Sequence, residues 1–213
     1  MQTQPRPALF LDRDGVINVD RGYVSRREDF EWLPGIFDLA RTAQGLGFAL
    51  VVVTNQSGIG RGYYTEQDFQ ALTAYMRERF VAEGVPLDAV YHCPFHPESE
   101  QAKYRHPDHP WRKPRPGMIL AARDELRLDL ARSAMVGDRV SDVEAGASAG
   151  VGALALIGAG EQLPQGWEDV ERFDQVADVA GWIAGLAKRQ GRDDGRAIVV
   201  TASPSVASVS PKG

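Results

Sequence analysis

The stretch Ala8-Leu-Phe-Leu-Asp-Arg-Asp-Gly-Val-Ile-Asn18 begins with an apolar run and turns polar at Asp12. Phe48-Ala-Leu-Val-Val-Val53 repeats this pattern more strongly, with β-branched residues and an abrupt polar end at Thr54-Asn55. Short apolar runs that end in polar residues are typical of buried strands. Weaker runs of the same kind predict three further strands, at Ala89–Tyr91, Ser133–Val136 and Gly152–Ile157.

Helical patterns lie between these strands. Thr65 and Asp68 have the spacing of an N-cap and its N3 partner, as do Ser141 and Glu144, and Pro116 stands where prolines commonly precede a helix. The predicted helices are Ile36–Leu46, Glu66–Glu83, Gly117–Leu128, Asp142–Ala149 and Val176–Lys188. Alternating strands and helices predict an α/β fold with a doubly wound, Rossmann-like parallel sheet of about five strands.

The composition is typical of one globular domain: 213 residues, 43% hydrophobic and 25% charged. We predict a single domain over residues 1–188. After Lys188 the sequence becomes rich in Gly, Arg and Asp and then in Ser, which predicts a flexible C-terminal tail over residues 189–213. Within this tail, Ala197–Thr201 is the alternative to disorder, as an edge strand.

Charge, apolar runs and cysteine content restrict the partners and the compartment. The longest apolar runs fall well short of the roughly 20 residues that cross a bilayer, and the N-terminal region has no signal-peptide core. Cys93 is the single cysteine, which excludes an intrachain disulfide framework and agrees with a reducing compartment. A net charge of −5 gives no electrostatic reason for a nucleic-acid partner. We expect a cytoplasmic monomer that binds neither membrane nor nucleic acid.

Polar residues follow three of the predicted strands, at Asp12–Asn18, Thr54–Ser57 and Gly137–Asp142. In open α/β sheets, ligands bind beyond the carboxyl ends of the strands. Each polar group alone is explained equally well as a helix cap or a turn, because Asp, Asn and Ser favour both. Their convergence at one edge of the sheet favours a binding site.

Asp12 and Asp14 are spaced so that both carboxylates point to the same side of an extended chain, and two like charges there need a cation. A calcium loop of the EF-hand kind is excluded, because Val16, Ile17 and Tyr23 occupy positions that would need an oxygen ligand, a glycine and a glutamate. A magnesium site with a carboxylate nucleophile remains.

Asp138, which follows the strand at Ser133–Val136, is the natural third magnesium ligand. A carboxylate that attacks a phosphate meets repulsion of roughly 4 kcal/mol per pair of unit charges at 4 Å and an effective dielectric near 20. Magnesium opposes this repulsion, and Lys113 is a candidate for a second cation, although an ordinary surface lysine is its alternative. Thr54 and the backbone amides after it can donate hydrogen bonds to phosphoryl oxygens.

Four motifs occur in this order: D-x-D-G-x-I-N, T-N-Q-S-G, R-K-P-x-P-G-M and G-D-x-x-x-D. Together they resemble the haloacid dehalogenase superfamily of phosphohydrolases. Within it, Asn18–Val24, Val53–Gly62 and Arg112–Met118 are similar to the D-glycero-D-manno-heptose-1,7-bisphosphate 7-phosphatases. The resemblance covers about residues 8–187, and histidinol-phosphate phosphatases are the nearest other relatives by motif.

The resemblance implies that Asp12 is the nucleophile that forms an aspartyl-phosphate and that Asp14 is the general acid and base. Magnesium would be held by Asp12, the backbone carbonyl of Asp14 and Asp138. Thr54 and Lys113 would orient the transferring phosphoryl group. The implied substrate-binding residues are Asp20, Arg21, Gly22, Tyr23, Asn55, Gln56, Ser57, Arg112 and Arg139.

The implied activity is magnesium-dependent hydrolysis of a small phosphorylated sugar, heptose 1,7-bisphosphate, at its 7-phosphate. Histidinol phosphate is the alternative substrate, and a phosphomutase is a third alternative because an aspartyl-phosphate can also pass its phosphoryl group to a sugar. The segment between Asp14 and Ile36 has no room for a large cap domain, so we expect an open site, whereas a mutase needs a lid that excludes water. A module that only bound phosphate would not need both Asp12 and Asp14.

Many of these relatives bind zinc in the loop that corresponds to His92–Pro116, through Cys-x-His and Cys-x-Cys. Here Cys93 is retained, but Phe95 stands at the histidine position, and His109 and Trp111 stand at the paired cysteine positions. Two ligands do not make a four-coordinate structural site. A rebuilt site would use Cys93, His96, His106 and His109. We expect no zinc, and a loop that its prolines stiffen.

Overall fold

The computed structural model describes residues 5–158 and 160–190. The predicted tail at 189–213 lies outside these ranges from residue 191 onward, and so does the alternative strand at 197–201.

The core of the fold is one sheet of six parallel strands in the order β3-β2-β1-β4-β5-β6. The strands are β1 Ala8–Leu11, β2 Ala49–Asn55, β3 Ala89–Cys93, β4 Ala134–Gly137, β5 Ala153–Ile157 and β6 Glu171–Phe173. The five predicted strands are confirmed with small shifts at their ends. The sixth was missed, because β6 is a three-residue edge strand, Glu-Arg-Phe, with no buried residue and thus no apolar run in the sequence.

The helices are α1 Ile36–Gly45, α2 Ser57–Gly60, α3 Glu66–Ala82, α4 Gly117–Leu126, α5 Val140–Ala149 and α6 Val179–Gln190. All five predicted helices are present. The capping pair of α3 is confirmed, because Thr65 Oγ1 accepts from the backbone N–H of Asp68 at 3.1 Å and the Asp68 carboxylate accepts from the N–H of Thr65 at 2.8 Å. Helix α6 begins three residues later than predicted, after a 3₁₀ turn at Val176–Asp178.

The predicted start of α5 was wrong. The helix begins at Val140, two residues before the predicted start at Asp142. Its cap is the Asp142 carboxylate, which accepts from the backbone N–H of Arg139 at 3.0 Å, and not the predicted pair of Ser141 and Glu144. The same spacing of two polar residues occurs two residues earlier in the sequence, at Arg139 and Asp142, and this earlier pair caps the helix.

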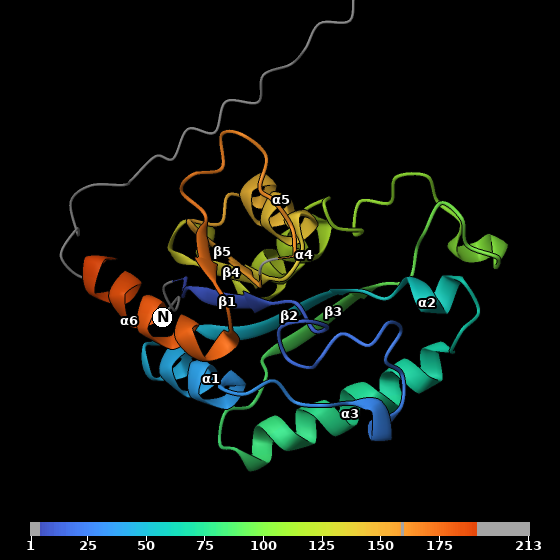
Figure 1. Cartoon of the computed structure of the whole chain (residues 1–213), viewed down its shortest axis with the longest axis horizontal. Helices are drawn as coiled ribbons and strands as arrows, with labels where there is room; N and C mark the ends of the chain where they lie inside the picture. Colours follow the sequence, from blue (N-terminus) through green and yellow to red (C-terminus); the bar gives the residue numbers. More distant parts are fainter. Residues whose placement is uncertain (1–4, 159, 191–213) are drawn as a thin grey trace, which may run out of the picture.

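Both faces of the sheet are covered by helices, with α1, α3 and α6 on one face and α4 and α5 on the other (Figure 1). Alternate strand residues supply the two cores. Leu9 and Leu11 pack with the first group of helices, and Ala8 and Phe10 pack with the second. The doubly wound parallel fold is therefore confirmed. No helix in the described part of the chain is long and apolar enough to span a bilayer.

The topology places a switch point between β1 and β4. From β1 the chain moves outward through β2 and β3, and from β4 it moves outward on the other side through β5 and β6. The carboxyl ends of β1, β2 and β4 therefore meet at one crevice, which is where ligands bind in such sheets. Between β1 and α1 the chain forms loops and the 3₁₀ turn Arg27–Asp29, so no large cap domain stands over this crevice.

Candidate active site

A cavity of about 440 Å³ opens at the carboxyl ends of the strands. Every residue that the sequence singled out for the site lines it, except Thr54 and Arg21. Three further residues, Tyr64, Ser141 and Asp142, also line the cavity. The fold thus gathers residues from widely separated segments into one site.

Three carboxylates form an acidic group at the centre of the cavity. Asp12, Asp138 and Asp142 each offer an oxygen within 4.8 Å of the others. Two glycines make this approach possible. A Cβ on Gly15, which has a φ of +85°, would lie 2.3 Å from Asp138 Oδ2, and a Cβ on Gly137 would lie 2.1 Å from Asp142 Cβ. Asp142 was not among the predicted site residues, although it ends the G-D-x-x-x-D motif.

Lys113 is buried inside this acidic group, so the alternative of a surface lysine is excluded. Its Nζ lies 2.9 Å from Asp12 Oδ1 and 2.5 Å from Asp142 Oδ1, and it donates to the Val53 carbonyl at 2.8 Å. Asn55 holds the backbone of Lys113 in both directions: its amide donates to the Lys113 carbonyl and its oxygen accepts from the Lys113 N–H, each at 3.1 Å. Asn55 therefore positions the lysine.

The electrostatics of the acidic group favour a bound cation. Burial, followed by the charges of Asp12 and Asp142, raises the pKa of Asp138 to about 7. Burial also raises the pKa of Asp12, although Lys113 opposes it. Burial alone would lower the pKa of Lys113, but Asp12 and Asp142 outweigh it and raise that pKa. The single positive charge of Lys113 thus offsets only part of the negative charge of the three carboxylates.

Asp138 Oδ1 is a buried oxygen that has no hydrogen-bond partner among the described residues. An unpaired buried acceptor is costly unless a cation or water binds it. Carboxylate oxygens are the ligands that Mg²⁺ prefers, so this donor set fits magnesium, with Asp12 and Asp138 as its side-chain ligands and Asp142 beside them.

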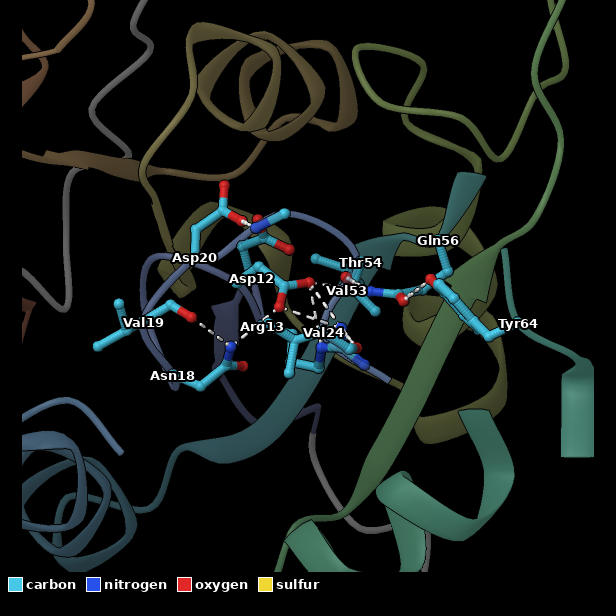
Figure 2. Close-up of polar contacts among 12 residues, drawn as sticks. Asp12, Arg13, Asn18, Val19, Asp20, Val24, Val53, Thr54, Gln56 and Tyr64 are labelled. Carbon is cyan, nitrogen blue, oxygen red and sulfur yellow. Dashed lines mark hydrogen bonds and ion pairs between the residues drawn. The ribbon is translucent and has the colours of Figure 1, made fainter. Parts of the chain in front are cut away.

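The carboxylate of Asp14 lies outside the acidic group. Arg13 Nη2 lies 2.9 Å from its Oδ2, Asn18 Nδ2 donates to its Oδ1 at 2.9 Å, and Gln56 Nε2 donates to its Oδ2 at 3.1 Å. Arg13 is itself almost fully buried and donates to the Val24 carbonyl at 2.7 Å (Figure 2). The sequence did not single out Arg13, although a cation between two aspartates was a signal. Asp14 is thus a cavity-lining carboxylate that other side chains hold in place.

Thr54 lies directly behind the cavity wall and is 1% exposed. Its hydroxyl oxygen accepts from Gln56 Nε2 at 2.8 Å, as Figure 2 shows. Gln56 is buried as well, while Ser57, the first residue of α2, borders the cavity. Thr54 and Gln56 therefore form a buried polar layer under the surface that a ligand would contact.

Two of the three predicted arginines are engaged with carboxylates. Arg21 pairs with Glu31, and both side chains are more than half exposed, so Arg21 does not face the cavity in this conformation. Arg139 lines the cavity, with Nη2 at 3.0 Å from Asp20 Oδ2 and Nε at 3.4 Å from Asp138 Oδ2. Neither guanidinium is free of competing carboxylates.

Arg112 differs, because it makes no ion pair with a carboxylate of the described residues. It is half-buried on the cavity wall and donates to the Phe95 carbonyl at 3.3 Å. Burial lowers its pKa, and the nearby Arg61 lowers it further. Gly22 and Tyr23 also line the cavity, with the Gly22 N–H donating to Asp20 Oδ1 at 2.9 Å. Arg112 is thus the predicted arginine that is available to an anionic ligand.

Comparisons with known proteins agree with this site. A family model described as HAD-hydrolase-like matches residues 110–179. The D-glycero-alpha-D-manno-heptose-1,7-bisphosphate 7-phosphatase of Burkholderia mallei is 55% identical over 150 residues, which cover 70% of this chain and 79% of that protein. The beta counterpart of Vibrio cholerae is 43% identical over 185 residues, which cover 86% of this chain and 99% of that protein. The chain belongs to the HAD-like phosphatases.

A solved structure is similar to this HAD-like phosphatase over most of its length. The D,D-heptose 1,7-bisphosphate phosphatase of B. bronchiseptica, complexed with magnesium and phosphate, aligns with a TM-score of 0.72 and 29% sequence identity, covering 84% of this chain and 98% of that chain. The family resemblance, the fold class and the enzyme class predicted from the sequence are all confirmed.

The histidine-containing loop of this HAD-like phosphatase does not fit a zinc site. Phe95 stacks on His109 with ring centroids 3.7 Å apart and planes inclined by 5°, and Arg61 Nη2 lies 3.1 Å from His96 Nε2. Cys93 is buried beneath the loop, and burial raises the pKa of its thiol, which opposes the thiolate that zinc needs. Among the described residues, the acidic group is the one set of three or more such ligands close enough to share a metal ion.

Proposed function

We propose that this phosphatase is a magnesium-dependent hydrolase that removes the 7-phosphate of a heptose 1,7-bisphosphate through an aspartyl-phosphate on Asp12. The observation that carries this proposal is the acidic group with Lys113 buried inside it, at the floor of an open cavity. The names of the similar proteins support the substrate.

The first half of the reaction transfers the phosphoryl group to the protein. A carboxylate oxygen of Asp12 forms a bond to phosphorus while the bond between phosphorus and the sugar oxygen breaks, and Asp14 gives that oxygen a proton. Lys113 keeps Asp12 ionised through its contact at 2.9 Å and offsets the repulsion between carboxylate and phosphate. Thr54 is buried and does not line the cavity wall, and in this proposal its hydroxyl would donate to the transferring phosphoryl group.

The second half returns Asp12 to its starting state. Asp14, now deprotonated, takes a proton from a water molecule that attacks phosphorus, and the bond to Asp12 breaks to release inorganic phosphate. Asp12, the backbone carbonyl of Asp14 and Asp138 would hold Mg²⁺, which when bound neutralises phosphoryl charge during both transfers. Asp14 lines the cavity, so its carboxylate can reach both the leaving sugar oxygen and the attacking water.

The second phosphate of a bisphosphate would bind Arg112. This guanidinium has no carboxylate partner within the described residues, whereas Arg21 and Arg139 are both paired. Arginine binds phosphate through two parallel charge-assisted hydrogen bonds, which gives geometric specificity as well as affinity. Histidinol phosphate has no second phosphate and would leave Arg112 unused.

Two measurements test the proposal. Initial rates on both anomers of heptose 1,7-bisphosphate, on fructose 1,6-bisphosphate and on histidinol phosphate should give the highest kcat/KM for a heptose bisphosphate. A preference for histidinol phosphate would reject the substrate. Asp12→Asn removes the nucleophile's charge at constant size, so turnover should vanish while the protein stays folded. A folded Asp12→Asn protein with near wild-type turnover would reject the covalent mechanism.

A further inference from the structure

Gln56 is a buried side chain whose amide is completely used inside the protein. It is 2% exposed. Its Oε1 accepts from the Tyr64 hydroxyl at 2.6 Å, and its Nε2 donates to Thr54 Oγ1 at 2.8 Å and to Asp14 Oδ2 at 3.1 Å. Although Gln56 borders the cavity, these contacts leave no amide hydrogen for a substrate (Figure 2).

The chemistry of the partners determines which way this amide points. Asp14 Oδ2 already accepts from Arg13 Nε at 3.1 Å and from Arg13 Nη2 at 2.9 Å, so the end of Gln56 that faces this oxygen must be the NH₂ group. The oxygen of Gln56 must then face the Tyr64 hydroxyl, which donates to it. Reversing the amide would place its oxygen against the Asp14 carboxylate and leave two acceptors in contact.

Tyr64 is held where it can serve this purpose. Its ring is 7% exposed and packs with Ile59 and Phe69. Gly58 makes room for it, because a Cβ at that position would lie 2.2 Å from a ring carbon of Tyr64. Burial raises the pKa of Tyr64, so its hydroxyl keeps its proton and remains a donor.

The orientation of Gln56 determines what Thr54 can do. The Thr54 oxygen accepts one of the two amide hydrogens, so its own hydroxyl hydrogen is directed away from Gln56. That hydrogen is then available to a phosphoryl oxygen in the cavity. With the amide reversed, Thr54 would donate to Gln56 and present only a lone pair to the phosphate.

We propose that Gln56, oriented by Tyr64, is a positioning residue that sets the hydrogen-bond direction of Thr54 and holds the carboxylate of Asp14. It acts through these two residues and not by contact with the substrate. The inference rests on the proposed function, in which Thr54 binds the transferring phosphoryl group and Asp14 transfers the protons.

Two substitutions of Gln56 separate hydrogen-bond direction from packing. Gln56→Met keeps the length of the side chain and removes both donors, so kcat should fall about 100-fold, as for loss of one transition-state donor, while KM changes by less than about twofold. Gln56→Glu replaces the NH₂ group that faces Asp14 and Thr54 by an oxygen, so kcat should fall further than in Gln56→Met, again with KM nearly unchanged.

Tyr64→Phe keeps the buried ring and removes only the hydroxyl, which makes it the variant that tests the proposal if the Gln56 variants do not fold. Its kcat should fall roughly five- to tenfold at unchanged KM, the size expected for one lost hydrogen bond. Tyr91→Phe is the matched control, since Tyr91 is also buried and donates at 2.6 Å, but to Glu125, which does not line the cavity. Its kcat should stay at the wild-type value.

All variants should be assayed on heptose 1,7-bisphosphate and on an aryl phosphate, with thermal unfolding measured in parallel. Because Gln56 acts through Thr54 and Asp14, its loss should lower kcat on both substrates, and by less on the aryl phosphate, whose leaving group depends less on a proton from Asp14. Wild-type protein that cleaves only the aryl phosphate would reject the proposed substrate and leave this test intact. Folded Gln56→Met or Tyr64→Phe protein with unchanged kcat, or with a loss confined to KM, would overturn the inference.

Discussion

Replacing Lys113 by methionine should destabilise the metal-free protein and make its stability depend strongly on pH. The lysine is buried, with Nζ at 2.9 Å from Asp12 Oδ1 and 2.5 Å from Asp142 Oδ1. Methionine has nearly the same length and no charge. The substitution therefore removes the cation that contacts Asp12 and Asp142 without creating a large cavity.

The size of the effect follows from these distances. At an effective dielectric of 20, pairs separated by 2.9 and 2.5 Å attract by roughly 6 to 7 kcal/mol each. Burying the charges costs several kcal/mol per ion, which offsets part of this attraction. Removing one partner of a buried ion pair typically costs about 3–5 kcal/mol, and we expect a loss of this size near pH 8.

The direction of the pH dependence follows from the pKa shifts. The folded-state pKa of Asp138 is raised to about 7, so the folded protein holds this proton more tightly than the unfolded chain, and metal-free stability falls as the pH rises from about 4 to 7. The raised pKa of Lys113 gives a contribution that is fully present throughout this range. Without the lysine, the pKa of Asp12 rises further, so the loss of stability should be largest above pH 7 and smaller near pH 5.

Urea unfolding of chelator-treated protein near pH 5 and pH 8 measures this effect, with Lys103→Met as the matched control at an exposed lysine. The control should unfold as the wild type does at both pH values. Adding magnesium to Lys113→Met should restore part of its stability, because the ion replaces the missing positive charge. A Lys113→Met protein as stable as the wild type near pH 8, or destabilised equally at both pH values, would refute this account of the acidic group.

Three further predictions concern metal binding. The apparent magnesium affinity, measured by calorimetry, should fall by up to about tenfold per pH unit below pH 7, because Asp138 must lose its proton to bind the ion; a flat profile would contradict this. Gly15→Ala should lower magnesium affinity and kcat, because the added Cβ would lie 2.3 Å from Asp138 Oδ2. Gly47→Ala is the matched control, since Gly47 has the same φ of +85° but no atom lies within 4 Å of the added Cβ. It should strain the backbone without changing magnesium affinity or kcat. Equal effects of the two glycine substitutions on magnesium affinity would refute the steric argument. Protein purified without added zinc should hold less than about 0.1 zinc per chain, and near-stoichiometric zinc that disappears in Cys93→Ser would overturn the prediction.

The strands and the carboxylates at their ends could be predicted because each depends on a local pattern. An apolar run followed by Asp12 identifies both a buried strand and the residue at its carboxyl end. The parallel topology then brings Asp12 and Asp138 together, since their strands β1 and β4 are neighbours. β6 had no such pattern, because a three-residue edge strand without a buried residue needs no apolar run.

Residues whose surroundings depend on partners far along the chain could not be described from local patterns. The motif resemblance predicted Lys113 at the site, but it is 101 positions from Asp12, and only the folded chain shows that it is buried between two carboxylates. Arg21 was predicted at the site from its motif, but Glu31 pairs with it outside the cavity. Gln56 was predicted as a substrate contact, and its burial shows that its neighbours use its amide.

Positively charged side chains at the floor of the cavity and on its wall differ in whether a carboxylate pairs with them. At the floor of the cavity, each cation is paired with carboxylates of the protein. Lys113 lies inside the acidic group, and Arg13 is paired with Asp14. Arg139 is paired with Asp20 and Asp138. Arg112 stands on the wall and has no carboxylate partner in the described part of the chain. A ligand with two anionic ends therefore meets two different environments. At the floor, carboxylates outnumber the lysine and a phosphate needs a metal ion to bind, whereas at the wall a guanidinium can bind a phosphate directly. Under the proposed function this asymmetry would orient a bisphosphate before any chemistry occurs, because only the end at the floor would lie next to Asp12, the proposed nucleophile.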